Sequence, residues 1–145
     1  MFSRLSFKAL LVSALCSAST LSLAALQMET IAEGLDTPWS VAELPDGGFL
    51  VTERPGSIQR VTPSGEMMAV TGVPEVFAKR QGGLFDVVLH PNFVANNTVF
   101  LAYAAGSEDS NRTTVARGVL DGSALTDVTV IFEVSPTKRG GGHFG

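Results

Sequence analysis

The stretch Trp39-Ser40-Val41-Ala42-Glu43-Leu44-Pro45-Asp46 decides the fold, because its pattern returns as Phe85-Asp86-Val87-Val88-Leu89-His90-Pro91-Asn92. In both copies an aromatic residue opens an apolar strand, and a proline followed by a turn-forming residue closes it. Pro45 and Pro91, like the other matched positions, lie 46 residues apart. This period predicts two copies of one structural unit rather than a single irregular domain.

Each copy is followed by further strand-like segments that are rich in apolar and β-branched residues. In the first unit they are separated by the turns Pro45-Asp46-Gly47-Gly48, Pro55-Gly56 and Pro63-Ser64-Gly65. Connections this short can only join antiparallel neighbours. We therefore predict two four-stranded antiparallel sheets, the fourth strand of the first being the weakest. The strands are expected at 39–44, 49–54, 58–62 and 67–71, then at 85–90, 98–104, 113–120 and 128–134.

Two four-stranded units with a period in the forties predict an all-β protein of the β-propeller type. An antiparallel sandwich in which the repeat arises by chance is the alternative. A propeller typically uses 4–8 blades, and closing the ring is what removes its sheet edges. Residues 25–145 hold only about two blades. We therefore expect them to be the truncated N-terminal part of a propeller domain, with open edges and little stability alone.

The first 24 residues have the order of features that a secretion signal requires. Arg4 and Lys8 precede an apolar run over 9–16, and small residues lead to Ser22-Leu23-Ala24. The run is shorter than the roughly 20 residues that a membrane-spanning helix needs. We expect cleavage after Ala24, which removes the only cysteine, Cys16. The mature protein is then predicted to be periplasmic or secreted, without a membrane span.

The composition excludes some classes of function but does not identify one. The 145 residues are 45% hydrophobic, contain 15 glycines and carry a net charge of −4. A general nucleic-acid-binding protein would need a basic surface, so no nucleic-acid partner is expected.

Few residues are candidates for chemistry. His143 follows three glycines, which allow a backbone to approach a ligand closely, and histidine accepts protons near neutral pH. His90 ends an apolar strand and is expected to cap a turn.

Gln81, in Gln81-Gly82-Gly83, stands just before the inner strand of the second unit, where a side chain can face a central channel or simply be solvated.

Several motifs occur in an order that resembles the soluble aldose sugar dehydrogenases of the glucose/sorbosone dehydrogenase family, which depend on pyrroloquinoline quinone (PQQ). The resemblance covers about residues 30–145. It is carried by Pro38-Trp39, Leu44-Pro45-Asp46-Gly47, Val51-Thr52-Glu53-Arg54-Pro55-Gly56, Gln81-Gly82-Gly83-Leu84 and Leu89-His90-Pro91-Asn92-Phe93.

The resemblance implies a six-bladed propeller that binds PQQ and calcium and oxidises aldose sugars at the anomeric carbon for an external electron acceptor. It implies that His143 is the general base and that Gln81 lines the cofactor and substrate pocket. No metal ligand is implied within this chain, because the family's calcium ligands and basic cofactor ligands belong to later blades. Lys138 and Arg139 are expected in a solvated loop, and the fragment alone is expected to be inactive.

Two other functions stay open at this point. A propeller of the same family could bind ligands or partners without catalysis. A calcium-dependent lactonase-type propeller would need acidic ligands on inner strands, for which Asp86 and Glu43 are the nearest candidates.

Overall fold

The computed structural model describes residues 26–142 and residue 144. The predicted secretion signal, residues 1–24, and the predicted base, His143, both lie outside the described residues.

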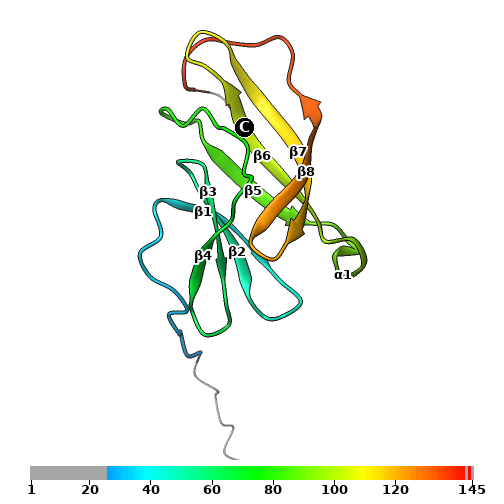
Figure 1. Ribbon diagram of the computed structural model, residues 1–145. Helices are drawn as coiled ribbons and strands as arrows, with labels where there is room; N and C mark the ends of the chain where they lie inside the picture. Colours follow the sequence, from blue (N-terminus) through cyan, green and yellow to red (C-terminus); the bar gives the residue numbers. More distant parts are fainter. Residues whose placement is uncertain (1–25, 143, 145) are drawn as a thin grey trace, which may run out of the picture.

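The described chain forms two four-stranded antiparallel sheets, each with its strands side by side in sequence order (Figure 1). This confirms the prediction of two up-and-down units. The first sheet consists of β1 (Pro38–Glu43), β2 (Phe49–Glu53), β3 (Ser57–Val61) and β4 (Met67–Ala69). The second sheet consists of β5 (Leu84–Leu89), β6 (Thr98–Gly106), β7 (Asn111–Asp121) and β8 (Ala124–Glu133), with the short helix α1 (Phe93–Asn96) between β5 and β6.

The two copies of the repeat differ in the turn that follows the inner strand. In the first sheet the turn is tight, because Leu44 N–H donates to Gly48 O and the Asp46 carboxylate accepts from Gly48 N–H at 3.0 Å. In the second sheet the chain instead enters α1. There Nδ1 of His90 accepts a hydrogen bond from the backbone N–H of Asn92 at 3.0 Å. His90 thus has the turn-capping contact that the sequence predicted.

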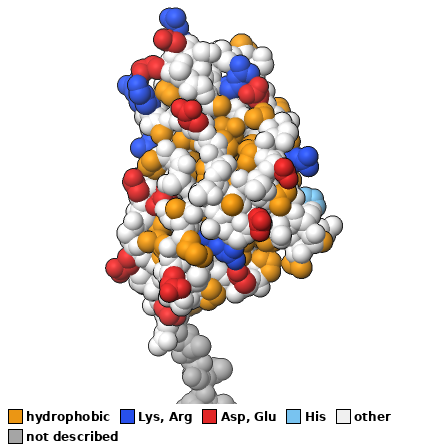
Figure 2. All heavy atoms as spheres, viewed as in Figure 1, with side chains coloured by type: hydrophobic (Ala, Val, Ile, Leu, Met, Phe, Trp, Pro, Cys, Tyr) orange, Lys and Arg blue, Asp and Glu red, His pale blue; other side chains and the backbone are white. Residues whose placement is uncertain are grey.

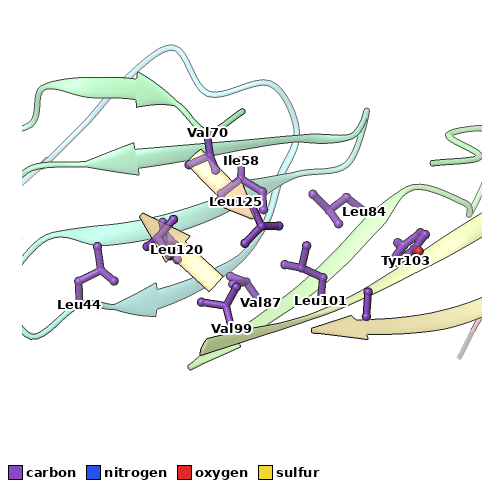
Figure 3. Packing of buried hydrophobic residues seen from close by; sticks show 12 residues of the cluster. Leu44, Ile58, Val70, Leu84, Val87, Val99, Leu101, Tyr103, Leu120 and Leu125 are labelled. Carbon is purple, nitrogen blue, oxygen red and sulfur yellow. The ribbon is translucent and has the colours of Figure 1, made fainter. Parts of the chain in front are cut away.

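One hydrophobic core joins the two sheets (Figure 3). Ile58 and Val70 come from the first sheet and the segment after it, and they pack with Leu120 and Leu125 from the hairpin of β7 and β8. Burying side chains of this kind is the main favourable term in folding. The sheets are therefore neighbours in one folded unit. The buried cluster comprises Leu44, Leu50, Ile58, Val70, Leu84, Val87, Val99, Leu101, Tyr103, Ala116, Leu120 and Leu125.

Backbone hydrogen bonds reinforce this contact at both ends of the sheets. Thr71 leaves the line of β4 and bonds to the β7–β8 turn, donating to Ser123 O at 2.9 Å and accepting from Leu125 N–H at 2.8 Å. This explains why β4 ends at Ala69, although the sequence predicted that the strand would extend to Thr71. At the opposite end, Leu84 N–H donates to Arg54 O at 3.0 Å, and Phe77 N–H to Ala104 O at 2.7 Å.

Parts of both sheets are uncovered, as the sequence predicted for two blades. Val41 of β1 is 63% exposed, and most of β8 is exposed on both faces. Figure 2 shows apolar atoms between interspersed acidic and basic side chains over the face in view. Within residues 26–142, no helix is long and apolar enough to cross a membrane.

Candidate functional site

A cavity of about 540 Å³ lies where the inner strands of the two sheets meet. Its walls come from both sheets, from the loop that precedes β5 and from the end of the chain. A volume of this size is in the range of small-molecule sites. The lining residues are Trp39, Gln81, Phe85, Asp86, Ala102, Thr113 and Phe144.

Aromatic rings form a continuous wall of this cavity. Trp39 and Phe85, the matched aromatic residues of the repeat, pack with their ring centroids 5.7 Å apart. Phe85 in turn lies 5.9 Å from Phe144, and Phe144 lies 6.4 Å from Phe77. Tilted contacts at these distances are favourable for aromatic pairs. The repeat in the sequence matches these aromatic residues but does not by itself assign them to a site. Their position at the start of both inner strands is the signal that could have done so.

The sequence Gln81-Gly82-Gly83 owes its glycines to close backbone contacts. A Cβ at Gly82 would collide with the carbonyl oxygen of Phe77, and one at Gly83 with that of Arg54. Gly83 also has φ of 148°, which disfavours any residue with a side chain. The guanidinium of Arg54 donates to the carbonyl oxygens of Arg80 and Gly82. The loop is therefore packed against the first sheet, and it brings Gln81 to the cavity.

The segment that leads to His143 lies directly against this loop. Gln81 N–H donates to Gly141 O at 2.8 Å. A Cβ on Gly141 would collide with Lys79 O, whereas one on Gly142 would lie 3.5 Å from Oε1 of Gln81. Since Phe144 also lines the cavity, both neighbours of His143 in the sequence are placed near Gln81. His143 itself is outside the described residues, so its role as a base stays a prediction.

Lys138 was expected to be solvated, and this prediction is wrong. Its Nζ donates to Oδ1 of Asn111 at 2.8 Å and lies 3.6 Å from the centroid of the Phe144 ring. Asn111 is fully buried and pairs with Lys138 through two backbone hydrogen bonds of 2.9 Å. Arg139 is 84% exposed, as expected of a residue in a solvated loop.

The acidic residues do not gather into a metal site in the part of the chain that the structure describes. Asp86 of β5 lines the cavity. Glu43, the last residue of β1, is not among the lining residues. Among residues 26–142, no three acidic, histidine or cysteine side chains lie close enough together to hold a metal ion. The arrangement expected for a lactonase-type calcium site is therefore not formed by these residues.

Glu53 is a buried carboxylate at the end of β2, and it is not among the residues that line the cavity. Burial alone would raise its pKa, but hydrogen bonds from Gln59, from the N–H of Asp36 and from Ser57 outweigh burial and hold the pKa below the usual value. These donors lie 2.6–2.8 Å from the two carboxylate oxygens. Glu53 thus ties the chain before β1 to β2 and β3, a structural role.

Successive four-stranded antiparallel sheets that pack in sequence order, with their inner strands beside a shared cavity, are the blades of a β-propeller. Comparison with known proteins then gives the family. Residues 35–145 match the family model described as Glucose / Sorbosone dehydrogenase. The chain belongs to this family, and the resemblance found in its motifs is confirmed.

The relatives are longer proteins. Aldose sugar dehydrogenase YliI of Escherichia coli is 37% identical over 142 residues, covering 93% of this chain and 38% of the relative. The Synechocystis protein slr1608 is 46% identical over 125 residues, covering 79% of this chain and 30% of the relative. The chain thus spans about a third of the length of these curated relatives.

Solved structures agree with the fold. The soluble aldose sugar dehydrogenase of E. coli, in its apo form, superposes with a TM-score of 0.76 at 37% identity, covering 81% of this chain and 35% of that one. The PQQ-bound aldose sugar dehydrogenase of Streptomyces coelicolor has a TM-score of 0.65 at 30% identity, covering 75% of this chain and 34% of that one. The propeller prediction is therefore confirmed over the sandwich alternative.

Proposed function

We propose that the whole protein is a PQQ-dependent dehydrogenase that oxidises aldose sugars at the anomeric carbon, and that this chain supplies one wall of its active site. The observation that carries the proposal is the meeting of Gln81 with Gly141, Gly142 and Phe144 at a cavity between two blades. Family membership and the PQQ-bound relative support the cofactor.

The cavity residues fit part of PQQ. A flat aromatic cofactor can pack against the rings of Trp39, Phe85 and Phe144, and the side-chain amide of Gln81 can both donate and accept hydrogen bonds. The three carboxylates of PQQ need cationic partners, however, and Asp86 is the one charged side chain among the described lining residues. We assign those partners to the rest of the whole protein. The described residues do not fit calcium, so no step is derived through that ion.

His143 has the chemistry that the first step requires. A ring nitrogen of a neutral histidine takes the proton from the anomeric hydroxyl, while carbon 1 loses a hydride and the sugar becomes a lactone. PQQ, when bound, is the two-electron acceptor for that hydride. Gln81 orients the reactants, and the aromatic wall excludes water from one side of the site. An external acceptor would take the two electrons, and the proton on His143 would pass to solvent.

The location of the protein is part of the same proposal. We propose that residues 1–24 direct export, which places the dehydrogenase in the periplasm or outside the cell. The test is N-terminal sequencing of the mature protein from a cell fractionation, where a start at Ala25 is expected. A protein that keeps residues 1–24 in the cytoplasmic fraction would contradict it.

The activity is tested with the whole protein, reconstituted with PQQ and calcium and assayed by dye reduction with glucose and other aldoses. We expect His143→Ala to lower kcat by about 10²–10⁴-fold, the usual contribution of a general base. His90→Ala, a change at the only other histidine of this chain, is the matched control and should keep kcat within about twofold. Equal kcat values for His143→Ala and the unmodified protein would overturn the role of His143, and no sugar oxidation at all would overturn the function.

Gln81 gives an independent test of cofactor binding. Titration of the apoprotein with PQQ, followed by the cofactor's absorbance, should give a Kd about tenfold higher for Gln81→Ala, as expected for one lost hydrogen bond. An unchanged Kd would show that Gln81 does not contact the cofactor.

A further inference from the structure

Lys138 joins the two ends of the segment that contains His143. At the start of this segment, Nζ of Lys138 bonds to Asn111 Oδ1 at 2.8 Å and to Gly140 O at 3.4 Å. At its end, the same Nζ lies 3.6 Å from the centroid of the Phe144 ring, within the range of a cation–π contact. We call Lys138, Asn111 and Phe144 the Lys138 clamp.

Asn111 gives the clamp a fixed base. Its side chain is fully buried, and it forms hydrogen bonds with Ser107, Lys138 and Gly140. Nδ2 of Asn111 donates to Ser107 O at 2.7 Å and to Gly140 O at 2.9 Å, which leaves Oδ1 to accept from Lys138. A buried network in which each member is satisfied is rigid.

Phe144 is held from three sides. Oγ1 of Thr113 donates to the carbonyl oxygen of Phe144 at 3.0 Å, and the ring of Phe144 packs against Phe77 and Phe85. The Lys138 ammonium covers the ring as well. Between Lys138 and Phe144 in the sequence, the carbonyl oxygen of Gly141 accepts a hydrogen bond from the N–H of Gln81. The segment after β8 therefore returns over the ends of β6 and β7 and is tied at its start, middle and end (Figure 1).

A purely structural reading would make Lys138 one of many contacts that stabilise the fold. Two observations favour a more specific role. The backbone pairing of residues 138 and 111 does not need the Lys138 side chain, so the turn keeps its anchor without the ammonium. The ammonium itself touches the turn and the ring that flank a glycine-rich, otherwise adaptable segment. Its removal should loosen residues 139–144 and leave the sheets intact.

We propose that Lys138 is a positioning residue, which fixes Gly140 and Phe144 and so holds the residues that flank His143 in the sequence beside Gln81 and the cavity. This inference rests on the proposed function, in which His143 is the base. Small displacements of a catalytic group are costly, because the reacting atoms must lie close together and aligned. Lys138 thus acts through Phe144 and the backbone and does not itself contact the reacting atoms.

The test compares Lys138→Met, which keeps the apolar stem and removes the charge, with Lys138→Arg, which keeps both a donor and a cation. In the whole protein loaded with PQQ, we expect Lys138→Met to lower kcat by roughly 10- to 100-fold, with KM for the sugar and Kd for PQQ within about twofold. Lys138→Arg should restore most of kcat. Arg139→Met is the matched control, because Arg139 is exposed, and should leave kcat and KM unchanged.

Hydrogen exchange provides a readout that does not depend on activity. In the apoprotein, the amides of residues 139–145 should exchange about tenfold faster in Lys138→Met, while those of β6 and β7 keep their protection. If Lys138→Met fails to fold, the milder Phe144→Leu, which removes the ring and keeps Lys138, should give the same local loosening.

The outcomes separate the inference from the function on which it rests. Unchanged exchange at 139–145 overturns the clamp, whatever the activity. Faster exchange with unchanged kcat overturns the positioning role, while a loss of activity in His143→Ala still supports the proposed function. Full activity in His143→Ala overturns the role of His143 as base and with it the positioning role, even where exchange shows that the clamp exists, whereas only the absence of sugar oxidation overturns the function.

Discussion

Val41 and Val87 occupy the same position of the repeat in the first and second sheets, yet their surroundings are opposite. Val87 is 3% exposed and belongs to the core between the sheets, whereas Val41 is 63% exposed. The strands are alike in sequence and in pairing. What differs is that the second sheet has the first sheet packed against it. Burial in a repeat protein therefore depends on the neighbouring unit as much as on the residue.

The positions that precede each inner strand differ in a related way. Thr37 and Gly83 are matched by the repeat, and their carbonyl oxygens accept equivalent bonds, from Arg54 N–H and Ala104 N–H. Thr37 tolerates a φ of 51° with a side chain, while Gly83 has Arg54 O against its Cα. At this pair of positions the repeat thus keeps the hydrogen bond, while φ and the residue type differ where the second unit touches the first.

The largest effect is expected from Gly83→Ala. The new Cβ meets Arg54 O, and the φ of 148° is strained for alanine, so the unfolding free energy should fall by roughly 3–4 kcal/mol. Thr37→Gly at the matched position should change it by no more than about 0.5 kcal/mol. Urea denaturation of the whole protein measures both. Similar costs at the two positions would show that contact between the sheets does not decide the choice of glycine.

Glu53 and Tyr103 are also matched, as the ladder partners of Pro38 and Leu84. Glu53→Leu leaves three donors without their acceptor, so we expect a loss of about 3 kcal/mol. Glu43→Leu, an exposed position of the same sheet, is the control and should cost less than about 0.5 kcal/mol. If the two variants were equally stable in urea denaturation, the network around Glu53 would carry no stability.

The pH dependence of this effect has a defined sign. The pKa of Glu53 is lowered in the folded protein, so its contribution is complete above the ordinary value of 4.5 and is lost as the pH falls through the folded pKa. The stability difference between the unmodified protein and Glu53→Gln should therefore shrink from pH 7 towards pH 3. A difference that stays constant over this range would contradict the lowered pKa.

Val87→Ala should cost about 2 kcal/mol, because it leaves a cavity in the core between the sheets. Val41→Ala sharpens the comparison. Its present exposure predicts a cost below about 0.5 kcal/mol, whereas a closed propeller, in which a further blade covers β1, predicts about 2 kcal/mol. We expect the larger value in the whole protein, measured by denaturation. The smaller value would mean that no further blade packs on this face.

The smallest effect is expected at Tyr103. Burial raises the pKa of its hydroxyl, and the charge of Glu133 adds to the shift. Because the neutral form is favoured in the folded protein, its contribution is complete below the ordinary pKa of 10.0 and is lost as the pH rises through the folded value. Between pH 9 and 11, the unfolding free energy of Tyr103→Phe should therefore fall less than that of the unmodified protein. The difference between the two decreases should be under about 1 kcal/mol. Parallel pH profiles would contradict this.

Much of the fold follows from the sequence, because alternating apolar residues and tight turns are local signals. The strands, their antiparallel order and their grouping by four needed nothing else. Details set by the neighbouring sheet did not follow. Thr71 looks like a continuation of β4 but pairs with the β7–β8 turn, and β8 begins at Ala124, four residues before its predicted start. The helix α1 is too short to leave a periodic pattern.

In the candidate site, too, local features were predicted from the sequence and contacts between distant residues were not. The motif left open whether Gln81 faces a channel or is solvated, and the structure places Gln81 at the cavity and explains the glycines by backbone contacts with Phe77 and Arg54. The contact of Lys138 with Phe144 was missed, because it depends on a turn that folds back to Asn111, 27 residues earlier. No local pattern encodes such a contact.

The shared core has a consequence for synthesis. Ile58 of the first sheet and Val70, just after it, are covered by Leu120 and Leu125, which lie 50 to 67 residues later in the chain. At roughly 5–20 residues per second, a ribosome takes about 3–13 seconds to supply that cover. During this interval the nascent first blade keeps an apolar face open. The core of the first blade is therefore complete only after the hairpin of β7 and β8 has been synthesised.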